Sequence, residues 1–259
     1  MHPASLTART RALWEGLAGV PVAFSPAIRV SVSPQSGICP PGWAGIVVIG
    51  EEAIATAPAP GLAHALQQAL GGLPAASLTD AGVLSARLSA AELRGPATLA
   101  YLDAGEFRPH PGATAVEPVG PQDGGLRSFL SECDAADLEE GGIEGITSPA
   151  FAVRERGSVV AVAGYRDWPG RVAHVCVLTG ARARGRGLAR ITGSAAAAHA
   201  IRQGRLPQWR ARLATSQRIA RELGFRELGS QASIRLHPPV FPDERAPLPG
   251  GSAGRAQHG

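Results

Sequence analysis

The chain has 259 residues, of which 44% are hydrophobic, and a formal net charge of +4. This composition excludes the disordered and fibrous classes, and the length fits one large domain or two of roughly 100 to 150 residues. Three widely spaced cysteines, Cys39, Cys133 and Cys176, predict a reduced protein without structural disulfides or a zinc site. The sequence has neither an apolar leader nor an apolar run of about 18 residues, so we expect a cytoplasmic protein with no membrane partner.

In the first 112 residues, predicted helices and strands alternate, which indicates a small α/β region of unknown role. Helices are predicted from Ser5 or Thr7 to about residue 19 and over residues 61–70, and strands over residues 28–32, 43–49 and 98–102. Residues 89–92, Ser-Ala-Ala-Glu, have the form of a capping box, so a short helix is expected there, ended by Gly95-Pro96.

A turn over residues 108–112 separates this region from a second half with a regular order of elements. Strands are predicted over residues 115–119, 151–154, 158–165, 172–179, 208–212 and 226–236, and helices over residues 123–133, 134–140 and 188–202 and from about residue 216. The tail, residues 237–259, is rich in proline and glycine and is expected to be disordered.

The stretch from residue 172 to residue 202 has the pattern of an anion-binding site. A strand is followed by a glycine-rich turn over residues 180–187 and then by a helix. Glycine accepts the positive φ angles that point successive backbone N–H groups into one concavity, and the helix start adds unpaired N–H groups and the positive end of its dipole. Four arginines lie in or beside the turn: Arg182, Arg184, Arg186 and Arg190. The pattern predicts a ligand that carries phosphates.

The turn lacks the lysine of a Walker loop and the third glycine of a dinucleotide fingerprint. Its spacing, with Gly185 three residues after Arg182 and Gly187 two further on, resembles the acyl-CoA loop of the GNAT superfamily of N-acyltransferases. That loop has the pattern Arg or Gln, two residues, Gly, one residue, and Gly or Ala. Residues 218–225, which end in Leu-Gly-Phe, resemble the family's last helix, and the order of the predicted elements from residue 116 to residue 236 is that of the GNAT fold.

The resemblance implies a GNAT domain over residues 113–236, of fold class α/β (α+β): a mixed central sheet with helices on both faces, preceded by the smaller N-terminal region. It implies acetyl-CoA or another acyl-CoA as co-substrate, without a metal, and a strand that splays from its neighbour to receive it. The acceptor would be an amine of a small molecule or a protein, and a homodimer stays open as the assembly. The implied acyl-CoA-binding residues are Val177, Leu178, Thr179, Arg182, Arg184, Gly185, Arg186, Gly187, Leu188, Ala189 and Ser216.

Acyl transfer to an amine requires that the ammonium lose a proton and that the thioester carbonyl be polarised. The resemblance assigns the carbonyl to a backbone N–H near Val177 or Leu178. His174 is the first candidate base, because a histidine near its ordinary pKa accepts a proton at neutral pH; its other interpretation is a histidine hydrogen-bonded beneath the sheet. Glu144 is the second candidate, with a solvated loop charge as its alternative. Tyr165 is the third, with a packing role as its alternative.

Two positions depart from the family pattern. Where the last-helix motif carries an Asn and a Tyr, this chain has Leu213 and Ala220. The tyrosine usually assigned as general acid is therefore missing, and water, another residue or unassisted departure of the thiolate must replace it. Two alternatives to an N-acyltransferase follow: an acyl-CoA-binding or regulatory module without turnover, and, less favoured, an arginine-rich nucleic-acid binder. The latter lacks a stacking platform, because Trp209 is the only aromatic residue between residues 168 and 225.

Overall fold

One continuous mixed sheet runs through the protein. The computed structural model describes residues 5–236, and these contain ten strands and seven α-helices. The strands are β1 (Val30–Val32), β2 (Ala44–Ile49), β3 (Glu52–Ala57), β4 (Ala90–Tyr101), β5 (Glu117–Val119), β6 (Ala150–Glu155), β7 (Ser158–Trp168), β8 (Val172–Thr179), β9 (Leu206–Ala211) and β10 (Arg226–Leu236). The helices are α1 (Leu6–Leu17), α2 (Pro60–Leu70), α3 (Ala81–Arg87), α4 (Gly124–Ser131), α5 (Ala135–Gly141), α6 (Leu188–Arg202) and α7 (Ala214–Glu222).

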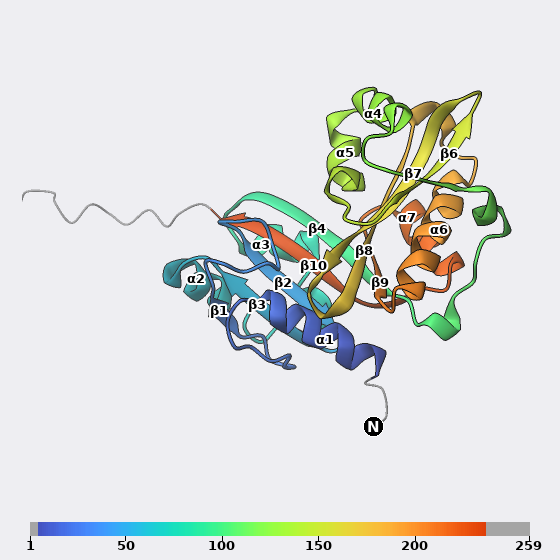
Figure 1. Ribbon diagram of the computed structural model, residues 1–259. Helices are drawn as coiled ribbons and strands as arrows, with labels where there is room; N and C mark the ends of the chain where they lie inside the picture. Colours follow the sequence, from blue (N-terminus) through green and yellow to red (C-terminus); the bar gives the residue numbers. More distant parts are fainter. Residues whose placement is uncertain (1–4, 237–259) are drawn as a thin grey trace, which may run out of the picture.

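The strands lie in the order β1-β3-β2-β10-β4-β9-β8-β7-β6-β5 (Figure 1). Neighbours are antiparallel except for the pairs β1–β3 and β8–β9, which are parallel. A parallel pair requires a crossover connection, and α6 supplies it between β8 and β9. The predicted α/β fold class with a mixed central sheet is confirmed.

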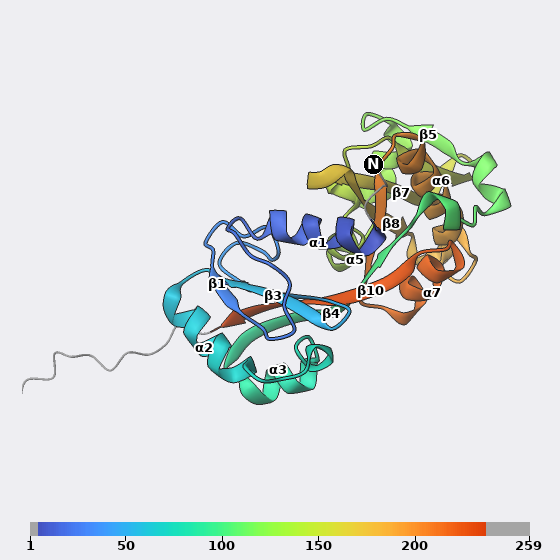
Figure 2. The same cartoon turned by 90° about the horizontal axis from the view of Figure 1, so that it is seen from below.

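Helices cover both faces of this sheet. On β2, Val47 and Ile49 pack with α1, whereas Ile46 and Val48 pack with α2 and α3, because successive side chains of a strand point to opposite faces. In the second half, α4 and α5 lie on the face of α1, and α6 and α7 lie on the face of α2 and α3 (Figures 1 and 2). Both faces of the sheet therefore carry apolar clusters, and the cluster under α1 includes Val172 and Leu206 of the second half.

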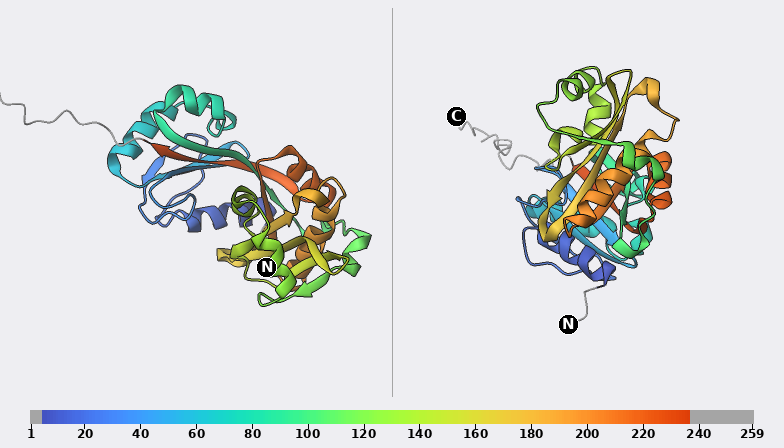
Figure 3. Two further views of the ribbon diagram at one scale, coloured as in Figure 1. Left: turned by 90° about the horizontal axis from the view of Figure 1, so that it is seen from above. Right: turned by 45° about the vertical axis from the view of Figure 1, so that its right-hand side comes forward.

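Two central strands join the halves of the chain. β10, from the end of the chain, lies between β2 and β4 of the first half, and β4 in turn pairs with β9 of the second half. Figure 3 shows β4 and β10 running from one lobe of the molecule to the other. The division predicted at residue 112 therefore does not divide the sheet, and the first half supplies a strand to the middle of the second.

Many predicted elements are confirmed, several with the predicted ends. The Ser5 side chain caps α1 by accepting from the Ala8 N–H at 3.2 Å, and β8, α6 and β10 have the predicted bounds. The helix expected at residues 89–92 is wrong, because this segment pairs with β10 as part of β4. Pro96 is tolerated there because it lies at a register shift of the pair, where ladder bonding is interrupted. The strand β3 and the helix α3 were not predicted, and the tail predicted to be disordered lies outside the described residues.

We expect Gly229→Ala to lower the free energy of unfolding by about 3 kcal/mol, because a Cβ at this position of β10 would lie 1.8 Å from the Val48 carbonyl oxygen. The measurement is chemical denaturation. Gly16→Ala is the matched control, since a Cβ at that position in α1 meets nothing within 4 Å and alanine favours a helix by about 0.5 to 1 kcal/mol. A Gly229→Ala protein as stable as the wild type would contradict the close pairing of β10 with β2.

Candidate functional site

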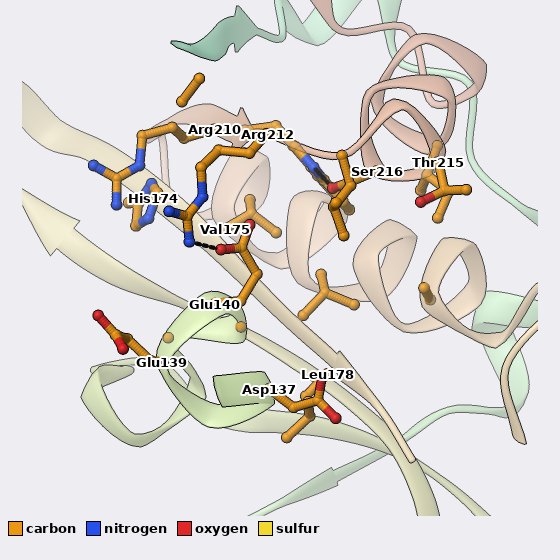
Figure 4. A pocket seen from close by; sticks show the side chains of 18 of the residues that line it. Asp137, Glu139, Glu140, His174, Val175, Leu178, Arg210, Arg212, Thr215 and Ser216 are labelled. Carbon is orange, nitrogen blue, oxygen red and sulfur yellow. Dashed lines mark hydrogen bonds and ion pairs between the residues drawn. The ribbon is translucent and has the colours of Figure 1, made fainter. Parts of the chain in front are cut away.

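A cleft of about 570 Å³ lies where β8 and β9 separate (Figure 4). The two parallel strands pair over three positions only, the last being His174 with Gln208. Beyond this point β8 continues to Thr179, whereas β9 pairs on its other side with β4. Residues from β4, α5, β8, β9, α7 and β10 line the cleft. The predicted splay of the strand before the loop is confirmed.

The backbone of β8 presents polar groups to this gap. The Gly180 N–H donates to the Val160 carbonyl at 3.0 Å, which sets the alternation of the antiparallel pair: even-numbered residues of β8 bond to β7. The N–H and C=O groups of Val177 and Thr179 therefore point away from β7 and into the cleft. Of the two positions predicted to polarise a carbonyl, the geometry selects the Val177 N–H and assigns the Leu178 N–H to the sheet.

The loop before α6 has the conformation of an anion-binding nest. Gly185 and Gly187 have φ angles of 77° and 76°, and Gly187 is the N-cap of α6. Within residues 5–236, none of the backbone N–H groups of residues 185–189 donates to a protein acceptor. A Cβ at Gly185 or Gly187 would meet nothing within 4 Å, so the concavity in front of these amides is open. Five successive free donors at a helix start favour a phosphate ligand.

The arginines of the loop are less available than their number suggests. Three of the four form ion pairs: Arg184 with Asp137 (2.5 Å), Arg186 with Glu155 (2.5 Å) and Arg190 with Glu222 (3.2 Å). Arg182 is exposed and has no carboxylate partner in the part of the chain that the structure describes. Among residues 5–236, the loop therefore offers one guanidinium without a carboxylate partner, on the residue that begins the predicted acyl-CoA motif, together with its row of amides.

His174 lines the cleft, as predicted, but its pKa is far from ordinary. The half-buried ring stacks on Trp168 with a centroid distance of 4.6 Å, and its Nδ1 lies 2.7 Å from the Gln208 Oε1. Burial, together with the nearby charge of Arg210, lowers the His174 pKa to about 3. The expectation of a pKa near the ordinary value is wrong, and His174 is a neutral imidazole at physiological pH. Because Nδ1 donates to an amide oxygen, Nε2 keeps the free lone pair.

A buried chain of hydrogen bonds connects His174 with the N-terminal helix. The Gln208 Nε2 donates to the Tyr101 hydroxyl at 3.3 Å, and the Trp14 Nε1 donates to the same hydroxyl at 2.7 Å. Trp14, Tyr101 and Gln208 are all inaccessible to solvent. The first half of the chain thus fixes the orientation of the His174 ring. Residues so far apart in the sequence give no local signal of this contact, and sequence reasoning missed it.

The other two predicted catalytic residues lie outside the lining of the cleft. Tyr165 stands opposite Val175 in the β7–β8 register, and its side chain is buried against α6, where its hydroxyl lies 3.0 Å from the His199 Nδ1. Strand alternation places Arg166 opposite His174 instead. Glu144 lies in a short 3₁₀ turn and is exposed to solvent. The position of Tyr165 fits its alternative interpretation, a packing role. The position of Glu144 fits its own alternative, a solvated loop charge.

Several charged residues of the cleft were missed by sequence reasoning. These are Arg94 of β4, Asp137, Glu139 and Glu140 of α5, Arg210 of β9, and Arg212, which directly follows β9 (Figure 4). One signal was available: Arg210 and Arg212 alternate at the end of a predicted strand, which places both side chains on one face. The strand predicted over residues 98–102 is the end of β4, but the contribution of Arg94 was missed because residues 89–92 were interpreted as a helix start.

The predicted acyl-CoA-binding residues form two groups. Those that line the cleft are Val177, Leu178, Thr179, Arg184, Ala189 and Ser216, whereas Arg182, Gly185, Arg186, Gly187 and Leu188 belong to the loop beside it. The Ser216 Oγ accepts a hydrogen bond from the Trp209 Nε1 at 2.9 Å, which leaves its hydroxyl proton to donate. Within residues 5–236, the Thr179 Oγ1 is buried without a partner. Open amides, exposed strand groups and an orphaned hydroxyl fit an elongated phosphate-bearing ligand such as acyl-CoA.

Residues 148–230 match the model of the family described as GNAT acetyltransferase. This segment is a GNAT acetyltransferase domain. The match begins before β6 and ends within β10, so it contains the splayed strands, the loop and α7. The GNAT family uses acyl-CoA as donor, which agrees with the fit of the cleft. No curated protein sequence matches the chain.

Three solved structures are similar to part of the chain. They are a protein assigned to the GNAT acetyltransferase family from Novosphingobium aromaticivorans (23% identity, TM-score 0.42), a GNAT-family acetyltransferase from Colwellia psychrerythraea (14%, 0.42) and a GCN5-related N-acetyltransferase from Kribbella flavida (19%, 0.44). The similarity covers 56%, 57% and 60% of this chain and 65%, 59% and 62% of theirs. The chain therefore spans less than two thirds of the length of each of these proteins.

Among residues 5–236, no helix has the length and apolar character needed to cross a membrane. In the same residues, His, Cys, Asp and Glu side chains form no group of three or more that could hold a metal ion.

The depressed pKa of His174 predicts a pH-dependent stability. A histidine with a pKa near 6.5 in the unfolded chain and about 3 in the folded protein binds more protons when unfolded, so it destabilises the protein as the pH falls from 6.5 towards 3. We expect this loss to be smaller in a His174→Gln variant, by at most about 1.4 kcal/mol per pH unit in that range. Urea denaturation at several pH values measures it. Parallel curves for the two proteins would show that the ring is freely protonated in the folded state.

Proposed function

We propose that the protein is an acyl-CoA-dependent N-acyltransferase that transfers an acetyl group from acetyl-CoA to a primary amine. The observation that carries this proposal is the row of free backbone N–H groups at residues 185–189, placed at the end of a strand that diverges from its neighbour. This arrangement provides donors for a pyrophosphate and, next to them, an open strand edge for the amide-bearing arm that follows it in coenzyme A. The GNAT match over residues 148–230 supports the same ligand.

Acetyl-CoA supplies an activated acyl group, and the residues of the cleft bind and orient the reactants. The Val177 N–H points into the gap and can donate to the thioester carbonyl oxygen, which polarises the carbon that the amine attacks. The Ser216 Oγ accepts from the Trp209 Nε1, so its hydroxyl proton can donate to the departing sulfur. Both groups are held by packed elements, so they need little reorganisation.

His174 is suited to orient the amine by accepting a hydrogen bond from it, and not to act as the base that takes its proton. Its low pKa keeps Nε2 unprotonated across the neutral range, and the hydrogen bond of Nδ1 to Gln208 fixes the ring. A neutral amine can donate a hydrogen bond to Nε2 while its lone pair points towards the thioester. Net proton loss then occurs to water, and the fraction of unprotonated amine limits the rate.

A second candidate function, acyl-CoA binding without turnover, is favoured by one observation. Ala220, at the position where the family pattern has a tyrosine, is buried in the core between α6, α7 and the sheet. No hydroxyl can reach the cleft from this position. Binding and turnover must therefore be measured separately. A nucleic-acid role has less support, because the ion pairs of Arg184, Arg186 and Arg190 leave few free cations in the loop.

Calorimetric titration with CoA and acetyl-CoA tests the binding site. We expect micromolar affinity that is weakened at least about tenfold by Gly187→Val, since the new side chain projects into the open space before the amides. Arg182→Ala should weaken binding by about 1.5 to 3 kcal/mol, the contribution of a charge-assisted hydrogen bond. Arg186→Ala is the matched control, because Glu155 already pairs with its guanidinium and its loss should have the smaller effect.

The same proteins are then assayed for CoA thiol release from acetyl-CoA with a panel of primary amines. Turnover with at least one amine that fails in Gly187→Val would support the acyltransferase. Tight CoA binding without turnover for any amine would favour the binding module. Unchanged CoA affinity in a folded Gly187→Val protein would remove both functions.

The pH dependence of the reaction should follow the acceptor. If the neutral His174 orients the amine, kcat/KM should rise with pH up to the pKa of the amine and show no break near pH 6.5, where an ordinary histidine titrates. Stopped-time assays with two amines of different pKa measure this. If kcat/KM showed a titration near pH 6.5 with both amines, and this titration were absent in His174→Gln, His174 would act as an ordinary base.

A further inference from the structure

The charges that line the cleft do not balance. The lining contains four arginines and three carboxylates, and each carboxylate has an arginine of its own: Asp137 pairs with Arg184, Glu139 with Arg94, and Glu140 with Arg212. Arg210 is left without a carboxylate partner in the part of the chain that the structure describes. A guanidinium cannot lose its charge at accessible pH, so the cleft keeps one uncompensated positive charge at a fixed place.

Arg210 is held in place by a neutral partner. Its Nη1 donates to the Gln231 Oε1 at 3.1 Å, and the buried Gln231 is fixed because its Nε2 donates to the Ile38 carbonyl. The Arg210 side chain is exposed at the cleft, and desolvation by the nearby protein atoms, together with the charge of Arg212, lowers the pKa of Arg210. An oriented cation with one neutral contact has N–H donors left for an anionic group.

Arg210 lies too far from the anion-binding loop to serve the phosphate site. Gln208 pairs with His174, and Arg210 lies two residues further along β9 on the same face. The anion-binding loop follows Thr179, five residues beyond His174, which is roughly 16 Å along an extended strand. Arg210 therefore lies beside His174 and next to Arg212, whose partner is Glu140 of α5, on the side of the cleft left for the acceptor (Figure 4).

We propose that Arg210 binds a carboxylate of the acceptor, so that the substrate is an amino acid or another small amine that carries a carboxylate. This inference rests on the proposed acyltransferase function and deepens it. The carboxylate forms charge-assisted hydrogen bonds with the N–H groups of Arg210. The amino group at the other end of the molecule then reaches His174 and the thioester carbonyl that the Val177 N–H polarises. Gln231, supplied by β10 and anchored on the first half of the chain, is a positioning residue for this contact.

The test compares acids with their amides in a binding assay that needs no turnover. The protein, saturated with CoA, is titrated calorimetrically with the N-acetyl derivatives of glycine, β-alanine, γ-aminobutyrate and glutamate and with the corresponding amides. In the wild type, at least one acid should bind at least about tenfold more tightly than its amide. Arg210→Gln should remove this preference and leave CoA affinity unchanged. Arg127→Gln, an exposed arginine on α4 outside the cleft, is the matched control and should keep it.

Two outcomes would overturn the inference: acids and amides bind equally throughout the panel, or the preference for an acid persists in Arg210→Gln. If the preference persists and Arg210→Gln weakens the binding of succinyl-CoA relative to acetyl-CoA, the carboxylate that Arg210 binds lies on the acyl group. The CoA titration of the same samples reports separately on the proposed function. A protein without affinity for CoA would contradict the proposed acyltransferase function. The acid and amide titrations would still measure whether Arg210 binds a carboxylate.

Discussion

The separation of β8 from β9 after His174 and Gln208 is the constraint on which the rest of the structure depends. Two parallel strands that stop pairing leave backbone donors and acceptors without partners, and such groups are costly unless a ligand or water satisfies them. The gap also creates the cleft, and it directs β8 to the loop whose amides face the phosphate site. The anion site, the exposed strand edge and the acceptor side of the cleft thus all depend on the end of the β8–β9 pairing.

The pairing of β10 with β4 and β2 explains why the first half of the chain belongs to the site. Because β4 lies between β10 and β9, it brings Arg94 to the cleft, and Tyr101 at its end takes part in the buried chain that orients His174. The residues of the first half therefore act on the reaction centre through contacts within a shared sheet. A companion domain joined by a flexible linker could not hold these groups to within a hydrogen bond.

Electrostatics in the cleft are dominated by arginine. Most guanidinium groups are neutralised locally by carboxylates of α5, β6 and α7, and these exposed pairs contribute little to stability. Among the described residues, these pairs leave Arg182 at the proposed phosphate site and Arg210 at the proposed acceptor site without a carboxylate partner. The same positive environment, with burial, keeps His174 neutral, which changes its part from proton acceptor to hydrogen-bond acceptor.

The sequence by itself determined the elements whose signals are local. The strand before the loop, the positive φ angles of Gly185 and Gly187, the start of α6 and the GNAT resemblance all follow from residues adjacent in the chain. Only the tertiary structure decided the rest. The capping-box pattern at residues 89–92 was overruled by pairing with β10, because ladder hydrogen bonds and burial outweigh a weak local preference. Likewise, the pKa of His174, the burial of Tyr165 and, among residues 5–236, the lack of a carboxylate partner for Arg210 depend on neighbours that the fold brings from distant segments, and no sequence window contains both partners.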